Sequence, residues 1–231
     1  MKRYITLLIL VCSFTVRALS ISPSLVYLDS PLGWKYLSES TSSSHFGNLI
    51  RYYQSQINLA YCGIASSVIM LNALHVPAPV DSWHYPYANF NQRSIFSPTL
   101  LKQGITPHKI SSRGMTLATL NRILTSYHLK TNVYYASSLT YKQFTNLLSK
   151  VMTTQKDYVV VNFYRPTLKQ VGGGHISPLA AFDPTRHRVL ILDVAGYKYP
   201  AVWVGERSLY QAMLAHDSAS KRSRGFIVLH R

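Results

Sequence analysis

Residues 56–66 read Gln56-Ile-Asn-Leu-Ala-Tyr-Cys62-Gly-Ile-Ala-Ser66, and they place a cysteine at the start of a predicted helix. Apolar residues recur at helical spacing from position 60 to 74, and Val76-Pro77 ends the pattern. The amide groups and the dipole at a helix N-terminus favour an anion, which lowers the pKa of a thiol. Gly63 would leave room for a substrate backbone. The stretch predicts either a reactive thiolate or a buried, inert thiol.

Two residues far downstream supply the other groups that a thiol nucleophile needs. His175 lies in Gly172-Gly-Gly-His-Ile-Ser-Pro178, and Asp193 lies in Leu190-Ile-Leu-Asp-Val194. Asp183-Pro184 is a turn signal, and a hairpin centred on Pro184 would put His175 directly opposite Asp193. Pro178 lacks an amide donor, which predicts an edge or bulged strand. The pattern predicts a base whose tautomer is fixed by a carboxylate, with Asp183 as the alternative orienting group.

The remaining patterns predict an α+β protein with one domain over residues 21–231. Helical spacing indicates helices at 60–74, 117–128 and 141–151. Apolar and alternating runs indicate strands at 131–135, 158–164, 176–182, 188–194 and 225–230. Residues 38–44 read as a surface loop, and residues 77–98 as a long irregular segment. Helices followed by strands predict a helical half packed on an antiparallel sheet.

Residues 1–20 predict a secretory signal peptide. Met1-Lys-Arg3 is basic, Tyr4–Phe14 is apolar, and Ala18-Leu-Ser20 offers small residues for cleavage. We expect an exported protein, periplasmic or secreted, and no transmembrane segment, because no apolar run reaches the roughly 20 residues that a bilayer requires. Removal of the signal takes away Cys12 and leaves Cys62 as the sole cysteine, so an internal disulfide is excluded.

The charge of the chain favours anionic partners. The net charge is +16, and removal of Lys2, Arg3 and Arg17 leaves 21 basic against 8 acidic residues, a net charge of +13. The basic residues are scattered and accompany no nucleic-acid motif, so we expect no nucleic-acid partner. The nine histidines show no metal-ligand spacing, and there is no Cys-x-x-Cys pair, so we expect no structural metal site.

Several short blocks occur together and resemble one known family, the phytochelatin synthases, which are papain-like enzymes that act on glutathione. The blocks are Ala60-Tyr-Cys-Gly-Ile-Ala-Ser66, Leu71-Asn-Ala-Leu74, Gly174-His-Ile-Ser-Pro178, Leu190-Ile-Leu-Asp-Val-Ala195, Tyr197-Lys-Tyr-Pro200 and Ser223-Arg-Gly-Phe226. They occur in the family's order and spacing, and the resemblance extends from about residue 50 to 230, nearly the whole predicted mature chain. The resemblance implies a papain-like cysteine protease fold.

The resemblance also implies roles for the catalytic residues. Cys62 would be the nucleophile, His175 the base and later the acid, and Asp193 the group that orients His175. Gln56, six residues before the cysteine, would help to form the oxyanion hole. The implied reaction is cleavage of the Cys–Gly bond of glutathione through a γ-glutamylcysteinyl thioester. Transfer to a second glutathione, which makes phytochelatin, is the accompanying reaction.

The resemblance further implies a site for the γ-glutamyl end of the substrate. Asp217 would bind the ammonium group and Arg224 the carboxylate, with Arg222 as a second basic candidate. The chain lacks the cysteine-rich C-terminal extension of the plant-type enzymes and resembles the short bacterial members. We therefore expect no required cofactor, and stimulation by heavy-metal ions only as complexes with glutathione. Whether the protein forms a homodimer stays open.

Two other functions remain open from the residues alone. One is a papain-like peptidase for other small peptides, which usually has its orienting carboxylate in an Asp-Pro pair, as at Asp183. The other is a basic binding protein of the cell envelope without catalysis. An activated Cys62 would be alkylated well below pH 8, whereas a buried structural thiol would not.

Overall fold

The structure is a computed structural model that describes residues 24–40, 42–80, 85–154 and 156–230. The helices are α1 (Pro31–Glu39), α2 (Ser44–Arg51), α3 (Cys62–Ala73), α4 (Pro98–Lys102), α5 (Pro107–Arg113), α6 (Leu117–Ser126), α7 (Tyr141–Met152) and α8 (Glu206–Leu214), with the 3₁₀ turns η1 (Ala136–Ser138) and η2 (Arg165–Leu168). The strands are β1 (Val26–Tyr27), β2 (Lys130–Tyr135), β3 (Asp157–Tyr164), β4 (Gly174–Asp183), β5 (Arg188–Ile191), β6 (Val202–Gly205), β7 (His216–Asp217), β8 (Arg222–Ser223) and β9 (Gly225–His230).

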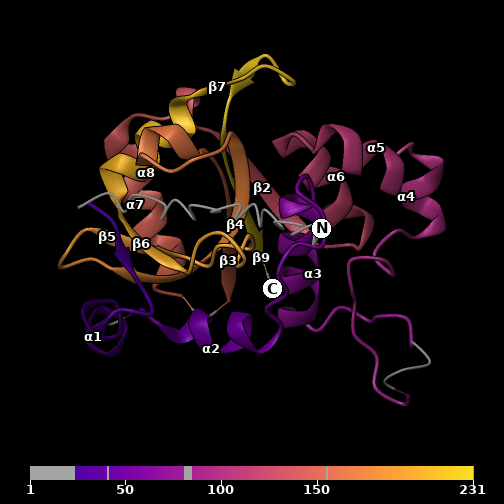
Figure 1. Cartoon of the computed structure of the whole chain (residues 1–231), viewed down its shortest axis with the longest axis horizontal. Helices are drawn as coiled ribbons and strands as arrows, with labels where there is room; N and C mark the ends of the chain where they lie inside the picture. Colours follow the sequence, from indigo (N-terminus) through magenta and orange to yellow (C-terminus); the bar gives the residue numbers. More distant parts are fainter. Residues whose placement is uncertain (1–23, 41, 81–84, 155, 231) are drawn as a thin grey trace, which may run out of the picture.

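A seven-stranded antiparallel sheet forms the centre of the molecule, with the strand order β1-β6-β5-β4-β3-β9-β2 (Figure 1). A separate two-stranded ribbon, β7–β8, projects beyond the sheet between α8 and β9. Strand β4 lies in the middle of the order, where both of its edges are paired. The predicted α+β architecture, with helices packed on an antiparallel sheet, is confirmed.

The predicted hairpin around Asp183-Pro184 exists, but its register differs from the expected one by three residues beside the turn and by two beyond the bulge. Strands β4 and β5 pair Asp183 with Arg188, and the register shifts at a bulge between Leu179 and Ala181. The expectation that His175 lies directly opposite Asp193 is therefore wrong, because Leu179 is the partner of Ile191 and the β4–β5 ladder ends there, before it reaches either residue. The strand that contains Pro178 is bulged, as expected, but it is central and not an edge.

One face of the sheet packs on α2, α3 and α6. Their apolar residues form a common core with the inward residues of β3, β4 and β9. All residues of α3 after Cys62 are buried, so this helix runs through the core with no exposed face. Ser66, one turn after Cys62, donates a hydrogen bond from Oγ to the carbonyl of Ile176, 3.1 Å away. This contact ties the first turn of α3 to β4 beside His175.

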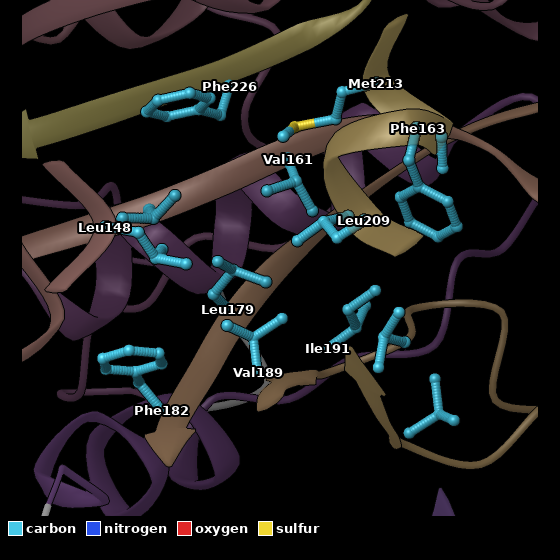
Figure 2. Close-up of a cluster of buried hydrophobic side chains, with 14 of the residues drawn as sticks. Leu148, Val161, Phe163, Leu179, Phe182, Val189, Ile191, Leu209, Met213 and Phe226 are labelled. Carbon is cyan, nitrogen blue, oxygen red and sulfur yellow. The ribbon is translucent and has the colours of Figure 1, made fainter. Parts of the chain in front are cut away.

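The opposite face of the sheet packs on α7 and α8. Figure 2 shows side chains of these helices meeting inward side chains of the sheet, namely Leu148, Leu209 and Met213 against Val161, Phe163, Leu179, Val189 and Ile191. Complete burial of a large apolar side chain stabilises the fold by about 1.5–3 kcal/mol. The sheet is therefore covered on both faces, whereas the sequence predicted one helical half.

Some predictions differ from the structure or lie outside it. The helices α1, α2, α4, α5 and α8 and the strands β1, β6, β7 and β8 were not predicted. Residues 38–44 are not wholly a surface loop, since Ser42 is buried and forms an antiparallel bridge with Phe182. The predicted signal peptide, residues 1–20, lies outside the described residues. Among the residues that are described, the structure contains no helix of the length and apolarity needed to cross a membrane.

Candidate active site

Cys62 is the first residue of α3, where the helix leaves its first amide groups without partners inside the helix. Burial opposes ionisation of the thiol, but the hydrogen bond and charge of His175 and backbone hydrogen bonds from Ile176 and Gly63 outweigh it, so the pKa of Cys62 is lowered. Gly63 leaves room for a neighbouring side chain and not for substrate, because a Cβ there would lie 2.2 Å from the Met115 sulfur. The thiol is set up to react as a thiolate.

His175 lies near the start of β4 and is 5% exposed. Its Nε2 is 2.8 Å from Oδ1 of Asp193, which leaves the other ring nitrogen, Nδ1, for the thiol of Cys62. Its ring packs edge-on against Phe163 at a centroid distance of 5.6 Å. Burial disfavours the charged ring, but Asp193 and the Cys62 thiolate outweigh burial and raise the pKa of His175. The two shifts together favour a thiolate–imidazolium pair.

Asp193 follows β5 and is 1% exposed. Its Oδ1 accepts from His175, from the amide of Ala195 at 2.9 Å and from Nη2 of Arg165 at 2.9 Å. Burial works against its charge, but His175 and Arg165 outweigh it and hold the pKa of this carboxyl far below its usual range. Asp183, the alternative orienting group, instead accepts hydrogen bonds from Arg186 in its own turn.

The segment that carries Gln56 is attached to the segment that carries Asp193. The amide of Gln56 donates to the Val194 carbonyl at 2.8 Å, and the Tyr53 hydroxyl donates to the Asp193 carbonyl at 2.8 Å. Nε2 of Gln56 donates to the Asn58 carbonyl and to the Tyr197 hydroxyl, each at 2.9 Å. An oxyanion-hole role for Gln56 stays a prediction, and it requires Nε2 to exchange one of these acceptors for the substrate oxygen.

A cavity of about 320 Å³ joins the reacting groups to two candidates for substrate binding. Its lining includes Cys62, His175, Asp217 and Arg224. Arg224 donates from Nη1 to Oδ1 of Asn162 at 2.9 Å, and its Nη2 lies 3.8 Å from Oδ1 of Asp217. Its Nε is buried without a partner. The cavity therefore offers a cation and an anion side by side at one end.

Glycine at position 174 makes room for this arginine. A Cβ on Gly174 would lie 2.2 Å from Nη1 of Arg224, a distance that no side chain can adopt without displacing the guanidinium. At Gly174, the guanidinium of Arg224 therefore fills the space that a side chain would occupy.

Arg222 is not brought to this cavity. It lines a separate depression together with Tyr135, His216 and Lys221, and its guanidinium carbon lies 4.5 Å from the centroid of the Tyr135 ring. Arg222 belongs to the β8 strand, whereas Arg224 follows it at the point where the chain passes to the central sheet. The expectation that Arg222 helps to bind substrate therefore has no support from its position.

Sequence reasoning missed Arg165 and Asn162, which contact Asp193 and Arg224. Both lie at the end of β3 or just after it, and β3 pairs with the strand of His175. An arginine before a proline and an asparagine in an apolar run carry no signal in the sequence alone. No group of three or more His, Cys, Asp or Glu side chains that could hold a metal ion occurs within the described ranges.

Comparison with known proteins shows to which family the chain belongs. The model of the phytochelatin synthase family matches residues 16–226. The chain belongs to the phytochelatin synthase family. The family model covers all the blocks on which the resemblance rested, together with Cys62, His175 and Asp193.

Curated proteins similar to this member of the phytochelatin synthase family include glutathione gamma-glutamylcysteinyltransferases. A glutathione gamma-glutamylcysteinyltransferase of Lotus japonicus is 30% identical over 90% of this chain and 43% of its own length. One of Arabidopsis thaliana is 30% identical over 84% of this chain and 41% of its own length. The chain thus spans less than half the length of these relatives. Among solved structures, Xylellain, a cysteine protease from Xylella fastidiosa, aligns with 92% of this chain and 87% of its own at 12% identity and a TM-score of 0.33.

Proposed function

We propose that the protein is a thiol peptidase that cleaves the Cys–Gly bond of glutathione. The observation that carries the proposal is the single cavity that contains Cys62, His175, Asp217 and Arg224. The names of the relatives, glutathione gamma-glutamylcysteinyltransferases, support glutathione as the substrate. The products of hydrolysis would be γ-glutamylcysteine and glycine.

The geometry supports acyl transfer through a thioester. The Cys62 thiolate attacks the carbonyl carbon of the Cys–Gly amide, and a C–S bond forms as the C–N bond breaks. His175 gives its proton to the departing glycine nitrogen, and Asp193 keeps the imidazolium in place through Nε2. The backbone amide of Cys62, at the free start of α3, is suited to bind the oxygen that becomes negative.

The pairing of Asp217 with Arg224 favours a γ-glutamyl substrate over an ordinary peptide. A γ-glutamyl group carries a free ammonium and a free carboxylate on the same carbon, whereas the N-terminus of an ordinary peptide carries only the ammonium. A carboxylate and a guanidinium 3.8 Å apart match such a pair of opposite charges. Arg224 with its forked geometry suits the carboxylate, and Asp217 suits the ammonium.

Resolution of the thioester decides between two reactions. Water gives hydrolysis, and the amine of a second glutathione gives dipeptidyl transfer and thus phytochelatin. We favour hydrolysis because the cavity is partly open to solvent. Heavy-metal ions would act as thiolate complexes of the acceptor glutathione and not as a resident cofactor. The basic charge and the predicted signal peptide support action on glutathione outside the cytoplasm.

The test is to incubate the purified protein with glutathione and to identify the products by mass spectrometry, with and without cadmium. The matched control is Cys62→Ala. Release of γ-glutamylcysteine by the wild type alone is the expected result, and longer γ-glutamylcysteine chains would add transfer. A folded, reduced protein that leaves glutathione intact would overturn the proposal.

The alternative of a peptidase for other small peptides would show itself in the same assay. Such an enzyme would hydrolyse peptides that begin with an ordinary α-linked residue as fast as the corresponding γ-glutamyl peptides. A binding protein without catalysis would retain glutathione unchanged and would leave Cys62 unreactive below pH 8.

A further inference from the structure

Arg165, the first residue of η2, is buried beside the catalytic carboxylate. It is 3% exposed, although arginine is almost never fully buried unless it is paired. It touches neither Cys62 nor the wall of the catalytic cavity in the described structure. Its burial therefore needs an explanation other than contact with substrate.

The guanidinium of Arg165 bridges two side chains. Nη2 donates to Oδ1 of Asp193 at 2.9 Å, and Nη1 donates to Oε1 of Gln170 at 2.7 Å. Nη1 also lies 2.8 Å from Oδ2 of Asp193, at an angle that makes an ion pair but no hydrogen bond. The ring of Tyr199 packs against the guanidinium, with its centroid 4.9 Å from the guanidinium carbon. These contacts fix both the position and the rotation of the Asp193 carboxylate.

The backbone of Arg165 holds the loop that leads to His175. Its amide donates to the Gly173 carbonyl at 3.0 Å, and its carbonyl accepts from the amide of Gln170 at 3.1 Å. The same residue thus anchors the segment just before the base and, through its side chain, the carboxylate that orients the base. Few single residues could control the relative position of His175 and Asp193 so directly.

Arg165 also balances the buried charge. In the reactive state Cys62 and Asp193 are negative and His175 is positive, so Arg165 brings the sum of these four groups to zero. Three tyrosines face the same carboxylate–guanidinium pair: Tyr27 from β1, Tyr53 from the loop after α2, and Tyr199 from the loop before β6. Burial raises the pKa of Tyr27 and of Tyr53, so these two stay neutral in the working range.

One lysine, Lys198, lies at the edge of this group of charged residues and tyrosines. Its Nζ is 5.6 Å from the ring centroid of Tyr199 and 2.7 Å from the Val171 carbonyl oxygen. Lys198 is partly exposed, so solvent screens its charge. The charge that Asp193 meets inside the protein therefore comes from His175 and Arg165.

We propose that Arg165 is a positioning residue, which fixes the Asp193 carboxylate on His175 and thereby maintains the reactive ion pair of His175 and Cys62. For turnover of glutathione this inference rests on the proposed function, but for the state of the thiol it does not. Loss of Arg165 leaves a buried carboxylate with a lost donor, free to rotate or to take up a proton. His175 then loses its partner, and Cys62 keeps its proton to higher pH.

The charge of Arg165 taken alone predicts a shift in the same direction, because removing a buried positive charge disfavours the thiolate and raises the pKa of Cys62. Arg165→Lys separates the two roles, since it keeps the positive charge and loses the planar fork. Positioning predicts a raised alkylation midpoint in this variant too, whereas simple electrostatics predicts none. A merely structural role predicts lower thermal stability with no shift at all.

The experiment follows alkylation of Cys62 by iodoacetamide against pH, in the wild type and in Arg165→Met. We expect the alkylation midpoint of the variant to rise by about one pH unit or more, which lowers the rate at pH 6 about tenfold. The matched control is Arg122→Met, which removes an exposed arginine on α6 and should leave the curve unchanged. An unchanged or lowered midpoint in Arg165→Met would overturn the proposal.

A second set of variants tests the route through Asp193. Asp193→Asn should raise the midpoint, and Arg165→Met added to Asp193→Asn should change it no further. Additive shifts would mean that Arg165 acts independently of Asp193, and would contradict the proposal. If Arg165→Met does not fold, Arg165→Lys replaces it, because a lysine cannot bridge Asp193 and Gln170 with a planar fork. A folded Lys variant with the wild-type curve would be equally contradictory.

The kinetic constants for turnover of glutathione provide a second test of the role of Arg165. Arg165→Met should lower kcat about tenfold or more and leave KM nearly unchanged, because Asp217 and Arg224 are untouched. A raised KM with an unchanged kcat would place Arg165 in substrate binding and would overturn the positioning role. If the wild type does not turn over glutathione, the proposed function fails, while the alkylation curves still decide the role of Arg165.

Discussion

The two ends of the catalytic cavity are built in different ways. At the chemical end, His175 and Asp193 are buried and joined by a hydrogen bond of 2.8 Å. At the recognition end, Arg224 and Asp217 belong to the short ribbon β7–β8 and its junction with the sheet, and their charges are 3.8 Å apart. Asp217 also accepts from Ser220 in its own turn, at 2.8 Å.

This difference separates two tasks. The three residues Cys62, His175 and Asp193 need no rearrangement before reaction, because the hydrogen bonds among them are already made and their charges are already paired. At the recognition end, Nε of Arg224 has no hydrogen-bond partner and Nη2 lies 3.8 Å from Oδ1 of Asp217, so the two charges are only loosely paired. Changes at the first end should therefore affect kcat, and changes at the second should affect KM.

The largest effect is expected at the chemical end. In the proposed mechanism His175→Ala removes both the base for Cys62 and the acid for the leaving amine, so kcat should fall about 10⁴-fold. The alkylation midpoint of Cys62 should return toward the pKa of a free thiol. Single-turnover kinetics with glutathione measures the first effect. A kcat within tenfold of the wild type would show that another group serves as the base.

At the recognition end, Arg224→Ala should raise KM for glutathione about 10- to 100-fold, the effect of a lost charge-assisted hydrogen bond, with a smaller change in kcat. Arg222→Ala is the matched variant, with the same loss of charge two residues away and outside the cavity. Steady-state kinetics compares the KM values of the two variants. Equal increases in KM would show that only the overall charge of the protein affects substrate binding.

The pH dependence should report the chemical end alone. Because the pKa of Cys62 is lowered and that of His175 is raised, the ion pair exists between the two values. Activity should fall about tenfold per pH unit below the lower value, where the thiolate is protonated, and above the higher value, where His175 loses its proton. Arg224→Ala should leave the limits of this kcat profile in place, and a shift of either limit would contradict the separation of the two ends.

A smaller effect is expected from crowding Arg224 indirectly. Gly174→Ala places a methyl group where Nη1 lies and should raise KM about fivefold by moving the guanidinium. Gly173→Ala is the control, since a Cβ there has nothing within 4 Å. Kinetics at a common temperature compares the two. Equal KM values would show that the cavity tolerates the displaced arginine.

The smallest effect concerns encounter with substrate. Glutathione is anionic and the protein is basic, so kcat/KM should fall about two- to threefold between 0.05 and 0.5 M salt. The value of kcat, measured with saturating glutathione, should not vary with salt. A kcat/KM that does not vary with salt would show that the net charge has no part in capture of the substrate.

The sequence predicted the contact of His175 with Asp193 but not the way it forms. The turn at Asp183-Pro184 was visible, and the parity of the two positions places their side chains on one face. The bulge after Leu179 and the early end of the ladder at Ile191 depend on packing, which no local pattern records. The contact survives the two-residue difference in register because the side chains approach diagonally.

Other parts of the site could not be predicted, for physical reasons. Strand β6 has four residues, too few for a clear periodic pattern, and helix α8 begins directly after it. Arg165 looks like an exposed loop residue in sequence, and only the folded sheet puts it beside Asp193, 28 residues away. Buried ion pairs between distant residues are properties of the tertiary structure alone.

The placement of Cys62, the proposed nucleophile, on α3 joins the proposed catalysis to global stability. Because α3 is buried along its whole length after Cys62, the nucleophile cannot be released by fraying or by local opening of a surface segment. The backbone amides of this helix from Ala65 onward should exchange with solvent only through unfolding of the entire domain. In denaturant, activity and tertiary structure would then disappear in one cooperative transition, and the active site would last as long as the fold itself.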